Sequence, residues 1–485
     1  MTALDCPLVI TAIFVSGIGG TFQYGFSLSV MTSPSPFIKE LVNRTCLQRY
    51  SVSLKHQQLS LIWSFIVSIY CIGGLVGSLA AAPLVSKFGR KRCLLLNNLV
   101  AILGAVLMLF SHRAMSFEMI MVGRFLYGIN SAGILAHSMY IVECAPKQLR
   151  GMVGVTIGNF ISLGKVFGQL LGLSELLGTE EMWPWLLSFS GVAALLQFST
   201  LPFLPESPSF LLLNRGDQET CEKALKRLRG NKDYGKEVEE MLEERTAHSS
   251  HSVMELIQNQ ALRWQLLTII IVFITLQLCG INAVYFYSFE VFSAAGIQES
   301  QLRYAALGTG LCELLTSFVI VETTGKKVLL FRGYMGMAVT LVLLTITLYL
   351  QTKVSWMPYC SMVLTFLFIL FFSIGPAGLV APLPGELLTQ SFKSAGYTIA
   401  YTLNWTGLFF VGMLFPILVD YLDYFCFLIF LIFCTICGLF AKFCIPETGN
   451  QTALEIAAEF TRMHCKSQKT YNTEQKLNKH VTTCD

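Results

Sequence analysis

The feature that most constrains the fold is a long series of apolar segments separated by short turns, several of which are basic. The clearest turn is Lys-Phe-Gly-Arg-Lys-Arg at 87–92, and a weaker version, Thr-Gly-Lys-Lys, stands at 324–327. A short basic turn between two apolar segments fixes the side of a membrane on which that turn lies. Its recurrence in the second part of the chain indicates a duplicated unit, and duplicated helical halves are typical of secondary transporters.

The chain is too apolar to be a soluble protein of its length. Of its 485 residues, 54% are hydrophobic and 13% are charged, and the mean hydropathy is +0.60. Apolar runs long enough to cross a bilayer are far more numerous than a single anchor requires. Their periodicity and length predict twelve spans, near residues 6–31, 60–84, 93–111, 116–142, 151–173, 183–204, 265–293, 302–322, 328–350, 357–386, 393–419 and 423–445.

These spans predict an all-α membrane protein built from two pseudo-symmetric six-helix halves. The halves are residues 1–205 and 265–452, and a tail follows at 453–485. The stretch 206–264 between them is rich in Glu, Lys and Arg, so it is too polar to insert and is interpreted as a cytoplasmic helical linker. Within it, Gln218 to Arg229 has helical periodicity.

The distribution of basic residues predicts the orientation. The turns after spans two, four and eight are basic, whereas the alternate loops carry few basic residues. By the positive-inside rule, both termini and the linker are cytoplasmic, so the tail at 453–485 is cytoplasmic too. The long first loop is then external, and its sequon, Asn43-Arg44-Thr45, predicts a glycan on Asn43.

Several chemical functions find no support in the sequence. The 15 cysteines show no metal-ligand spacing, and no nucleotide-binding loop or catalytic constellation is present. The net charge of +4 comes without a basic patch interleaved with aromatic residues. We therefore expect no enzyme activity, no cofactor, no metal and no nucleic-acid partner.

Charged residues gather at the cytoplasmic ends of the spans. Glu143 precedes Arg150 by the same spacing as Glu386 precedes Lys393, which is the clearest sign of internal repetition. A single such charge is interpreted most simply as a solvated topology anchor, but the set predicts ion pairs across the two halves. Such pairs would hold the inner faces together and break when the carrier opens inward. The candidate gating charges are Arg90, Glu143, Arg150, Glu206, Glu322, Lys326, Glu386 and Lys393.

Five motifs resemble those of the sugar-porter family, within the major facilitator superfamily: Phe22-Gln23-Tyr24-Gly25, Trp183-Pro184, Pro205-Glu206-Ser207-Pro208, Gln277-Leu278-Cys279-Gly280-Ile281-Asn282-Ala283 and Pro446-Glu447-Thr448. The resemblance runs from the first span to Thr452 and is greatest to the class that includes fructose carriers. It implies a facilitative, energy-independent uniporter of hexoses, fructose and/or glucose, which works by alternating access. It also implies a small-molecule sugar as the substrate, a monomer in the lipid bilayer, and a plasma-membrane location.

The resemblance also implies which residues bind the sugar. A sugar hydroxyl that leaves water needs a polar partner, which amide side chains supply. Three of the family's amides are retained, at Gln277, Asn282 and Asn404. At four other family positions this chain has Gly158, Leu276, Glu313 and Ala381, so it offers a sugar fewer hydroxyl partners than the family pattern does. Further candidates are Gln169, Tyr24 and Trp405, the last either stacking on a sugar or packing in the core, while Tyr285 and Tyr287 are expected to close the outer mouth of the site.

Two ionisable residues, Lys165 and Glu313, stand inside predicted spans five and eight. A lone charge at the bilayer centre costs about 2.5–3.5 kcal/mol on insertion scales, so each must face water or a partner. One hypothesis is that they face each other across the cavity, as a pair or as separate ligands for a polar or anionic solute. The other is that each is only hydrated there.

Three other functions remain open. Lys165 is compatible with an organic-anion or urate-like carrier. Either membrane charge could couple transport to protons, although proton-coupled relatives place an aspartate on span one, where the region from Phe22 to Ser27 has no carboxylate. Lys326 and Lys393 replace arginines of the family. A lysine ammonium is a point charge and lacks the planar, bidentate geometry of a guanidinium, so we expect weaker ion pairs at the cytoplasmic face. At the extreme, the protein would be a non-transporting sensor.

Overall fold

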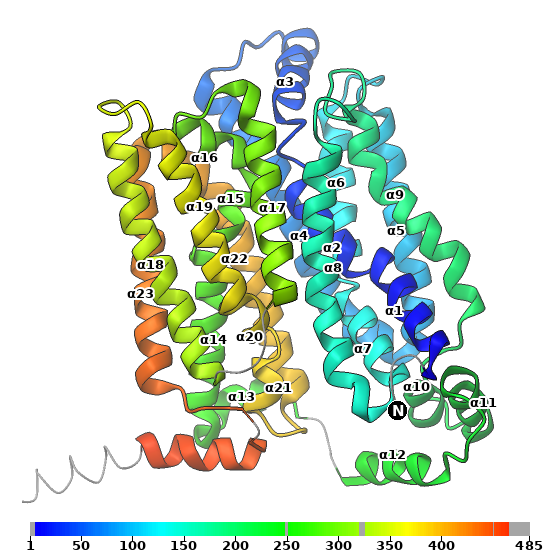
Figure 1. The fold of residues 1–485 in the computed structure, drawn as a ribbon. Coiled ribbons are helices and arrows are strands. Elements are labelled where there is room, and N and C mark those ends of the chain that lie inside the picture. Colours follow the sequence, from blue (N-terminus) through cyan, green and yellow to red (C-terminus); the bar gives the residue numbers. More distant parts are fainter. Residues whose placement is uncertain (1–4, 248–250, 320–324, 450, 465–485) are drawn as a thin grey trace, which may run out of the picture.

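The structure is a computed structural model that describes residues 5–247, 251–319, 325–449 and 451–464. These residues form helices and connecting turns, with no β-strand among them. Two helical bundles stand side by side, one made of α1 to α9 and the other of α14 to α23, and four short helices join them at one end (Figure 1).

The first bundle contains six spans, two of which are interrupted. Its spans are α1 (Pro7–Gly19) with α2 (Thr21–Ser29), α4 (His56–Phe88), α5 (Arg90–Ser111), α6 (Phe117–Ser131) with α7 (Ile134–Cys144), α8 (Arg150–Leu171) and α9 (Trp183–Thr200). The connecting elements are α3 (Ser35–Tyr50) and two 3₁₀ turns, η2 (Lys147–Leu149) and η3 (Leu201–Phe203). The linker helices are α10 (Pro208–Leu213), α11 (Gln218–Arg229), α12 (Gly235–Ala247) and α13 (Val253–Gln258).

The second bundle repeats this arrangement. Its spans are α14 (Arg263–Leu278) with α15 (Ile281–Phe286) and α16 (Ser288–Ala294), α17 (Leu302–Val319), α18 (Lys326–Leu350), α19 (Met357–Ile374) with α20 (Pro376–Leu379) and α21 (Leu383–Leu387), α22 (Lys393–Leu422) and α23 (Cys426–Cys444). The 3₁₀ turns are η4 (Gln260–Leu262), η5 (Glu299–Gln301) and η6 (Asp423–Phe425), and residues 453–464 form a last helix.

The described helices account for all twelve predicted spans. Ten helical stretches are long and apolar enough to cross a membrane by length and composition. The last of them, Lys393–Cys444, contains two spans, because η6 separates α22 from α23. The twelfth is α17, which carries Arg303 and Glu313. The chain is thus a multi-pass membrane protein, and the predicted helix Gln218–Arg229 in the linker is also confirmed.

Four spans predicted to be continuous are broken in the structure: the first, fourth, seventh and tenth. Gly20 separates α1 from α2, and Gly280 has φ +91° between α14 and α15, a conformation that only glycine adopts without strain. Gly375 and Pro376 interrupt the tenth span. Each break falls in the first span of a group of three, so the two halves each contain a repeat of three helices. Breaks of this kind free backbone groups beside the binding sites of transporters.

Glycines bring α2 and α8 into close contact. A Cβ atom added to Gly25 would lie 1.9 Å from the carbonyl oxygen of Ile161, and one added to Gly164 would lie 2.2 Å from that of Phe22. Small residues allow such approaches between helices in membranes, where van der Waals packing replaces the hydrophobic effect as the driving force. This contact fixes the direction in which α8 projects its polar side chains.

The linker and both described chain ends lie at one end of the molecule, and α3 lies at the other (Figure 1). We call these ends the linker side and the α3 side. The linker is held to the first half, because the Arg229 guanidinium donates to the carbonyl oxygens of Cys144 and Ala145, at 3.2 and 3.0 Å. Lys147 pairs with Glu240 on α12, and this hydrogen bond lowers the pKa of the Glu240 carboxyl.

Candidate functional site

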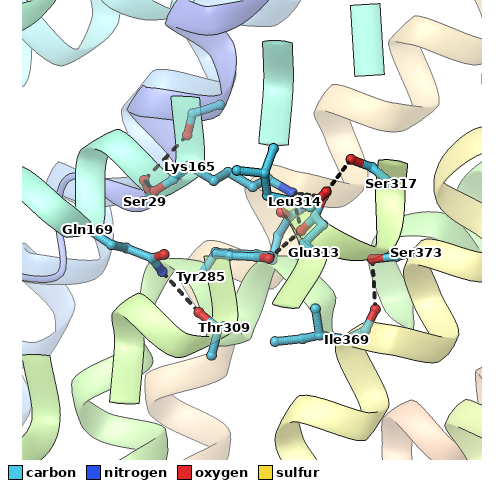
Figure 2. A network of polar contacts seen from close by, with 12 residues as sticks. Ser29, Lys165, Gln169, Tyr285, Thr309, Glu313, Leu314, Ser317, Ile369 and Ser373 are labelled. Atoms are coloured by element: carbon cyan, nitrogen blue, oxygen red, sulfur yellow. Dashed lines mark hydrogen bonds and ion pairs between the residues drawn. The ribbon is translucent and has the colours of Figure 1, made fainter. Parts of the chain in front are cut away.

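A buried ion pair joins the two halves. Lys165 Nζ on α8 lies 3.0 Å from each carboxylate oxygen of Glu313 on α17, and both residues are 4% exposed (Figure 2). The hypothesis that these charges face each other is confirmed, and their burial argues against each being merely hydrated. A second contact lies one turn along each helix, where Gln169 Nε2 donates to Thr309 Oγ1 at 3.0 Å. The two contacts lie one helical turn apart and both connect α8 to α17.

Tyr285 of α15 completes the environment of the pair. Its hydroxyl donates to Glu313, and its ring centroid lies 4.2 Å from Lys165 Nζ, a cation–π distance. Its carbonyl oxygen accepts from Thr32 Oγ1 at 3.0 Å, which ties the broken seventh span to the first half. On the other side, Ser29 Oγ donates to the carbonyl oxygen of Lys165 at 2.8 Å. Lys165 is thus fixed by α2 through its backbone and by α15 and α17 through its side chain.

An amide chain lies beside the break in the seventh span. Asn282 Nδ2 donates to Gln277 Oε1, and Gln277 Nε2 donates to Asn404 Oδ1 of α22, each at 2.6 Å. Gln277 and Asn282 are 2% and 5% exposed, and Asn404 is half-buried. The amides predicted to bind a sugar therefore lie together and satisfy one another. A hydroxylated solute would exchange these bonds for its own, since amides both donate and accept.

Tyr24 and Trp405 connect the amide chain to the first half. The Tyr24 ring contacts Trp405, the residue that follows Asn404 on α22. The Trp405 ring meets those of Tyr24 and Tyr70 edge-on, with centroids 5.6 Å apart in each case. At 3% exposed, Trp405 packs in the core here, which corresponds to the second of its two predicted roles.

The ion pairs on the linker side differ from those predicted. Arg90 pairs with Glu143 at 2.9 Å, both in the first half, and Lys326 pairs with Glu386, both in the second. The prediction of ion pairs across the halves is wrong for these four residues. The reason is geometric: each basic residue begins the span that packs against the end of the acidic residue's span, so the nearest opposite charge belongs to the same half.

The two linker-side clusters are equivalent by internal repetition. Ser207 donates to Glu143, and Thr448 Oγ1 donates to Glu386 at 2.9 Å. Glu206 accepts from the backbone N–H of Lys91 at 3.0 Å, and Glu447 accepts from that of Lys326 at 2.9 Å, so each caps the start of a span. The roles of Ser207, Thr448 and Glu447 were not predicted, although the Glu-Ser and Glu-Thr motifs contain them.

The remaining predicted gating residues are less tightly connected. Among the residues that the structure describes, neither Arg150 nor Lys393 forms an ion pair. Glu322 lies outside the described residues. Tyr287 is fully buried, and its hydroxyl donates to the carbonyl oxygen of Gly412 on α22.

Asn43, the residue predicted to carry a glycan, is half-buried on α3.

Polar contacts between the halves occur at the centre and on the α3 side. On that side Lys39 of α3 lies 3.1 Å from Glu290 of α16, and Arg303 donates to the carbonyl oxygen of Ser33 at 3.3 Å. On the linker side, the ion pairs of the described residues lie within one half, within the linker or within the last helix, or join the first half to the linker. This is the pattern expected of a carrier that is closed toward the α3 side.

Comparisons with known proteins agree on one family. Residues 12–460 match the family described as "Sugar (and other) transporter". Human solute carrier family 2, facilitated glucose transporter member 11, is 42% identical over 465 residues, which are 94% of each chain. Human member 9 is 40% identical over 485 residues, 99% of this chain and 89% of the relative, and member 5 from Ovis aries is 38% identical over 466 residues, 94% and 93%.

Solved structures show the same fold. The partially occluded inward-open form of the xylose transporter XylE from E. coli superposes with a TM-score of 0.75 at 21% identity, covering 92% of this chain and 100% of that one. The resemblance inferred from the motifs is confirmed by these relatives. The chain belongs to the sugar transporter family, among the facilitated glucose transporters of solute carrier family 2, and has the twelve-helix fold of the major facilitator superfamily.

Proposed function

We propose that this sugar transporter is an energy-independent uniporter of hexoses, fructose and/or glucose, which works by alternating access. The observation that carries the proposal is the amide chain of Gln277, Asn282 and Asn404 at the break of the seventh span. It offers several donors and acceptors in a buried place, which is what a neutral polyhydroxylated solute needs on leaving water. Tyr24, Trp405, Gln169, Lys165 and Glu313 complete the proposed binding site.

The two halves are proposed to rotate relative to each other about the two contacts between α8 and α17, Lys165–Glu313 and Gln169–Thr309. To open toward the α3 side, the protein must break contacts there, such as Lys39–Glu290 and Thr32–Tyr285. Tyr285 and Tyr287 would move with them and admit the solute. The linker-side clusters around Glu143 and Glu386 lie within single halves, so we propose that they brace each half as a rigid body.

Transport without coupling is supported by the ionisable groups near the site. The first span has no carboxylate between Phe22 and Ser27. Glu313 is bound to Lys165 and to the Tyr285 hydroxyl, so its charge is already compensated by groups of the protein. Lys165 is equally occupied, which weakens the reading of this chain as an organic-anion carrier.

The test is uptake of labelled fructose, glucose and urate into proteoliposomes that contain the purified protein, with and without a pH gradient. Saturable hexose uptake that does not respond to the gradient is the expected result. Hexose accumulation driven by the pH gradient would contradict the uniporter proposal and indicate a proton-coupled carrier. Urate uptake without hexose uptake would refute the proposal that hexoses are the substrates.

Replacing Asn282 with alanine is expected to weaken hexose affinity by about tenfold or more. The change removes the amide of Asn282 as a partner for the sugar, and a sugar hydroxyl left buried without its partner in the complex costs about 1–3 kcal/mol. The measurement is the half-saturation concentration for uptake. Asn97→Ala is the control, because Asn97 donates to the carbonyl oxygen of Asn130 within the first half. Equal effects of the two changes would show that Asn282 has only a structural role.

We further propose that the protein is a monomer in the plasma membrane, with residues 1–205 and 265–452 as its halves and with the linker at 206–264, the tail at 453–485 and both termini in the cytoplasm. This orientation places α3 outside, so Asn43 should carry a glycan. Asn43→Gln is expected to abolish a glycosidase-sensitive gel shift, whereas Asn450→Gln, in a sequon predicted to be cytoplasmic, should leave it unchanged. A shift that persists in Asn43→Gln but not in Asn450→Gln would reverse the orientation.

A further inference from the structure

The ion pair between Lys165 and Glu313 is the one charged element in the described structure that spans both halves with both partners almost fully buried. Glu313 supplies both of its oxygens to Lys165, and the Tyr285 hydroxyl donates to the same carboxylate. The charges therefore cancel within one contact. Any solute that reaches this part of the site meets a positive and a negative group 3.0 Å apart.

A cationic or anionic solute cannot bind favourably to such a pair. An anion that approaches Lys165 is repelled by the carboxylate beside it, and a cation that approaches Glu313 is repelled by the ammonium group. In a buried site, where the effective dielectric constant is low, this repulsion is large. A neutral hydroxyl group suits both partners, because it accepts from Lys165 and donates to Glu313. Charge-assisted hydrogen bonds of this kind are stronger than those between neutral groups.

The other buried cation near the site does not change this balance. Arg124 on α6 donates to the backbone carbonyl oxygens of Ser27 and Val67, and it lies over the ring of Tyr70, 4.4 Å from its centroid. Its guanidinium carbon also lies 5.8 Å from the ring centroid of Phe286 on α15, so its described partners are backbone carbonyl groups of the first half and the rings of Tyr70 and Phe286 rather than Glu313. Lys165 and Glu313 alone place opposite charges at the contact between α8 and α17.

We propose that the Lys165–Glu313 pair sets the charge selectivity of the central site: it admits neutral polyols and excludes sugars that carry a carboxylate or an ammonium group. The proposal concerns the hexose site of the proposed function and rests on it. It follows that either partner, left alone, should recruit the solute of opposite charge. Loss of the Glu313 charge would favour a sugar acid, and loss of the Lys165 charge would favour an amino sugar.

The experiment is a thermal-shift titration of the full-length purified protein with glucose, fructose, glucuronate and glucosamine. A ligand that binds only the folded state stabilises it by an amount that grows with the logarithm of the ligand concentration divided by Kd, so the shift in melting temperature reports affinity without a transport assay. The wild type should respond to a neutral hexose and bind glucuronate at least tenfold more weakly. Glu313→Gln should gain at least about tenfold in glucuronate affinity, about 1.4 kcal/mol. Lys165→Gln should gain similarly for glucosamine.

Two double variants serve as controls. Lys165→Gln/Glu313→Gln has no charge to recruit and should bind neither charged sugar. The reversed pair, Lys165→Glu/Glu313→Lys, should restore the neutral preference. The proposal is overturned if the wild type binds glucuronate as tightly as glucose, or if neither single variant gains affinity for its predicted charged sugar. If Glu313→Gln does not fold, the glucosamine response of Lys165→Gln decides.

The failure of this proposal can be told apart from the failure of the proposed function. If the wild type binds no neutral hexose but the single variants still gain affinity for the charged sugars, the charge-selectivity proposal stands and the proposed hexose function fails. If the wild type binds a neutral hexose but neither single variant gains affinity for its charged sugar, the proposed hexose site stands and the charge-selectivity proposal fails.

Discussion

Lys165→Met is expected to destabilise the folded carrier by about 3–5 kcal/mol, because it leaves the Glu313 carboxylate buried without its counter-charge. Methionine fills a volume similar to that of the lysine stem, so packing against Tyr285 is retained and the loss reports on the charge. The desolvation cost of a buried ion pair is met only while both partners are present. Removal of both charges in Lys165→Met/Glu313→Gln should therefore recover much of the lost stability, even though one further residue has changed.

The measurement is the melting temperature of the two single variants, the double variant and the wild type, followed by fluorescence-detected size-exclusion chromatography after heating. The control is Lys39→Met. Lys39 and Glu290 also join the two halves, but their side chains are 32% and 30% exposed, and partly solvated pairs contribute about 0–1 kcal/mol. If Lys165→Met has the same melting temperature as the wild type, water must reach the Glu313 carboxylate. The contact would then be incidental to the stability of the protein.

The sequence offers this pair as one of two hypotheses, for a simple physical reason. A lone charge inside an apolar span is costly, so each must face water or a partner, and only the structure decides for the partner. The spans themselves are predicted just as directly, since length and hydropathy decide membrane insertion. The helix Gln218–Arg229 is predicted because its apolar residues lie on one face, where Ala224 and Leu228 are buried.

Other features of the site depend on information that a linear pattern lacks. Which half a charge pairs with depends on how helix ends meet in space, so the expectation that Arg90 and Lys326 pair across the halves is wrong. Thr309 is an ordinary hydroxyl on an apolar helix, and only the position of Gln169 across the interface gives it a role. The breaks at Gly20 and Gly375 were missed because single glycines are common in membrane helices and do not by themselves predict an interruption.

Gly164→Ala is expected to destabilise the protein by at least about 3 kcal/mol and to abolish hexose binding. The added Cβ would lie 2.2 Å from the carbonyl oxygen of Phe22 and 2.8 Å from the backbone nitrogen of Phe26, so no side chain can move aside to accept it. The helices α2 and α8 would have to separate. Overpacking of a tight core costs about 1–3 kcal/mol when side chains absorb it, and more is expected where only backbone is in contact. The separation would also break the bond from Ser29 to Lys165.

Gly158→Ala on the same helix is the matched comparison, and the melting temperature and hexose-induced thermal shift of both variants are the measurements. No atom lies within 4 Å of a Cβ added at Gly158, and the residue is exposed. Alanine favours a helix over glycine by about 1 kcal/mol, so this variant should be as stable as the wild type or slightly more stable. Both changes add one methyl group to α8, and they differ only in what that methyl group meets. A Gly164→Ala protein that melts and binds like Gly158→Ala would therefore show that α2 and α8 can separate without cost. The close packing of α2 against α8 could then not be what holds Lys165 in position.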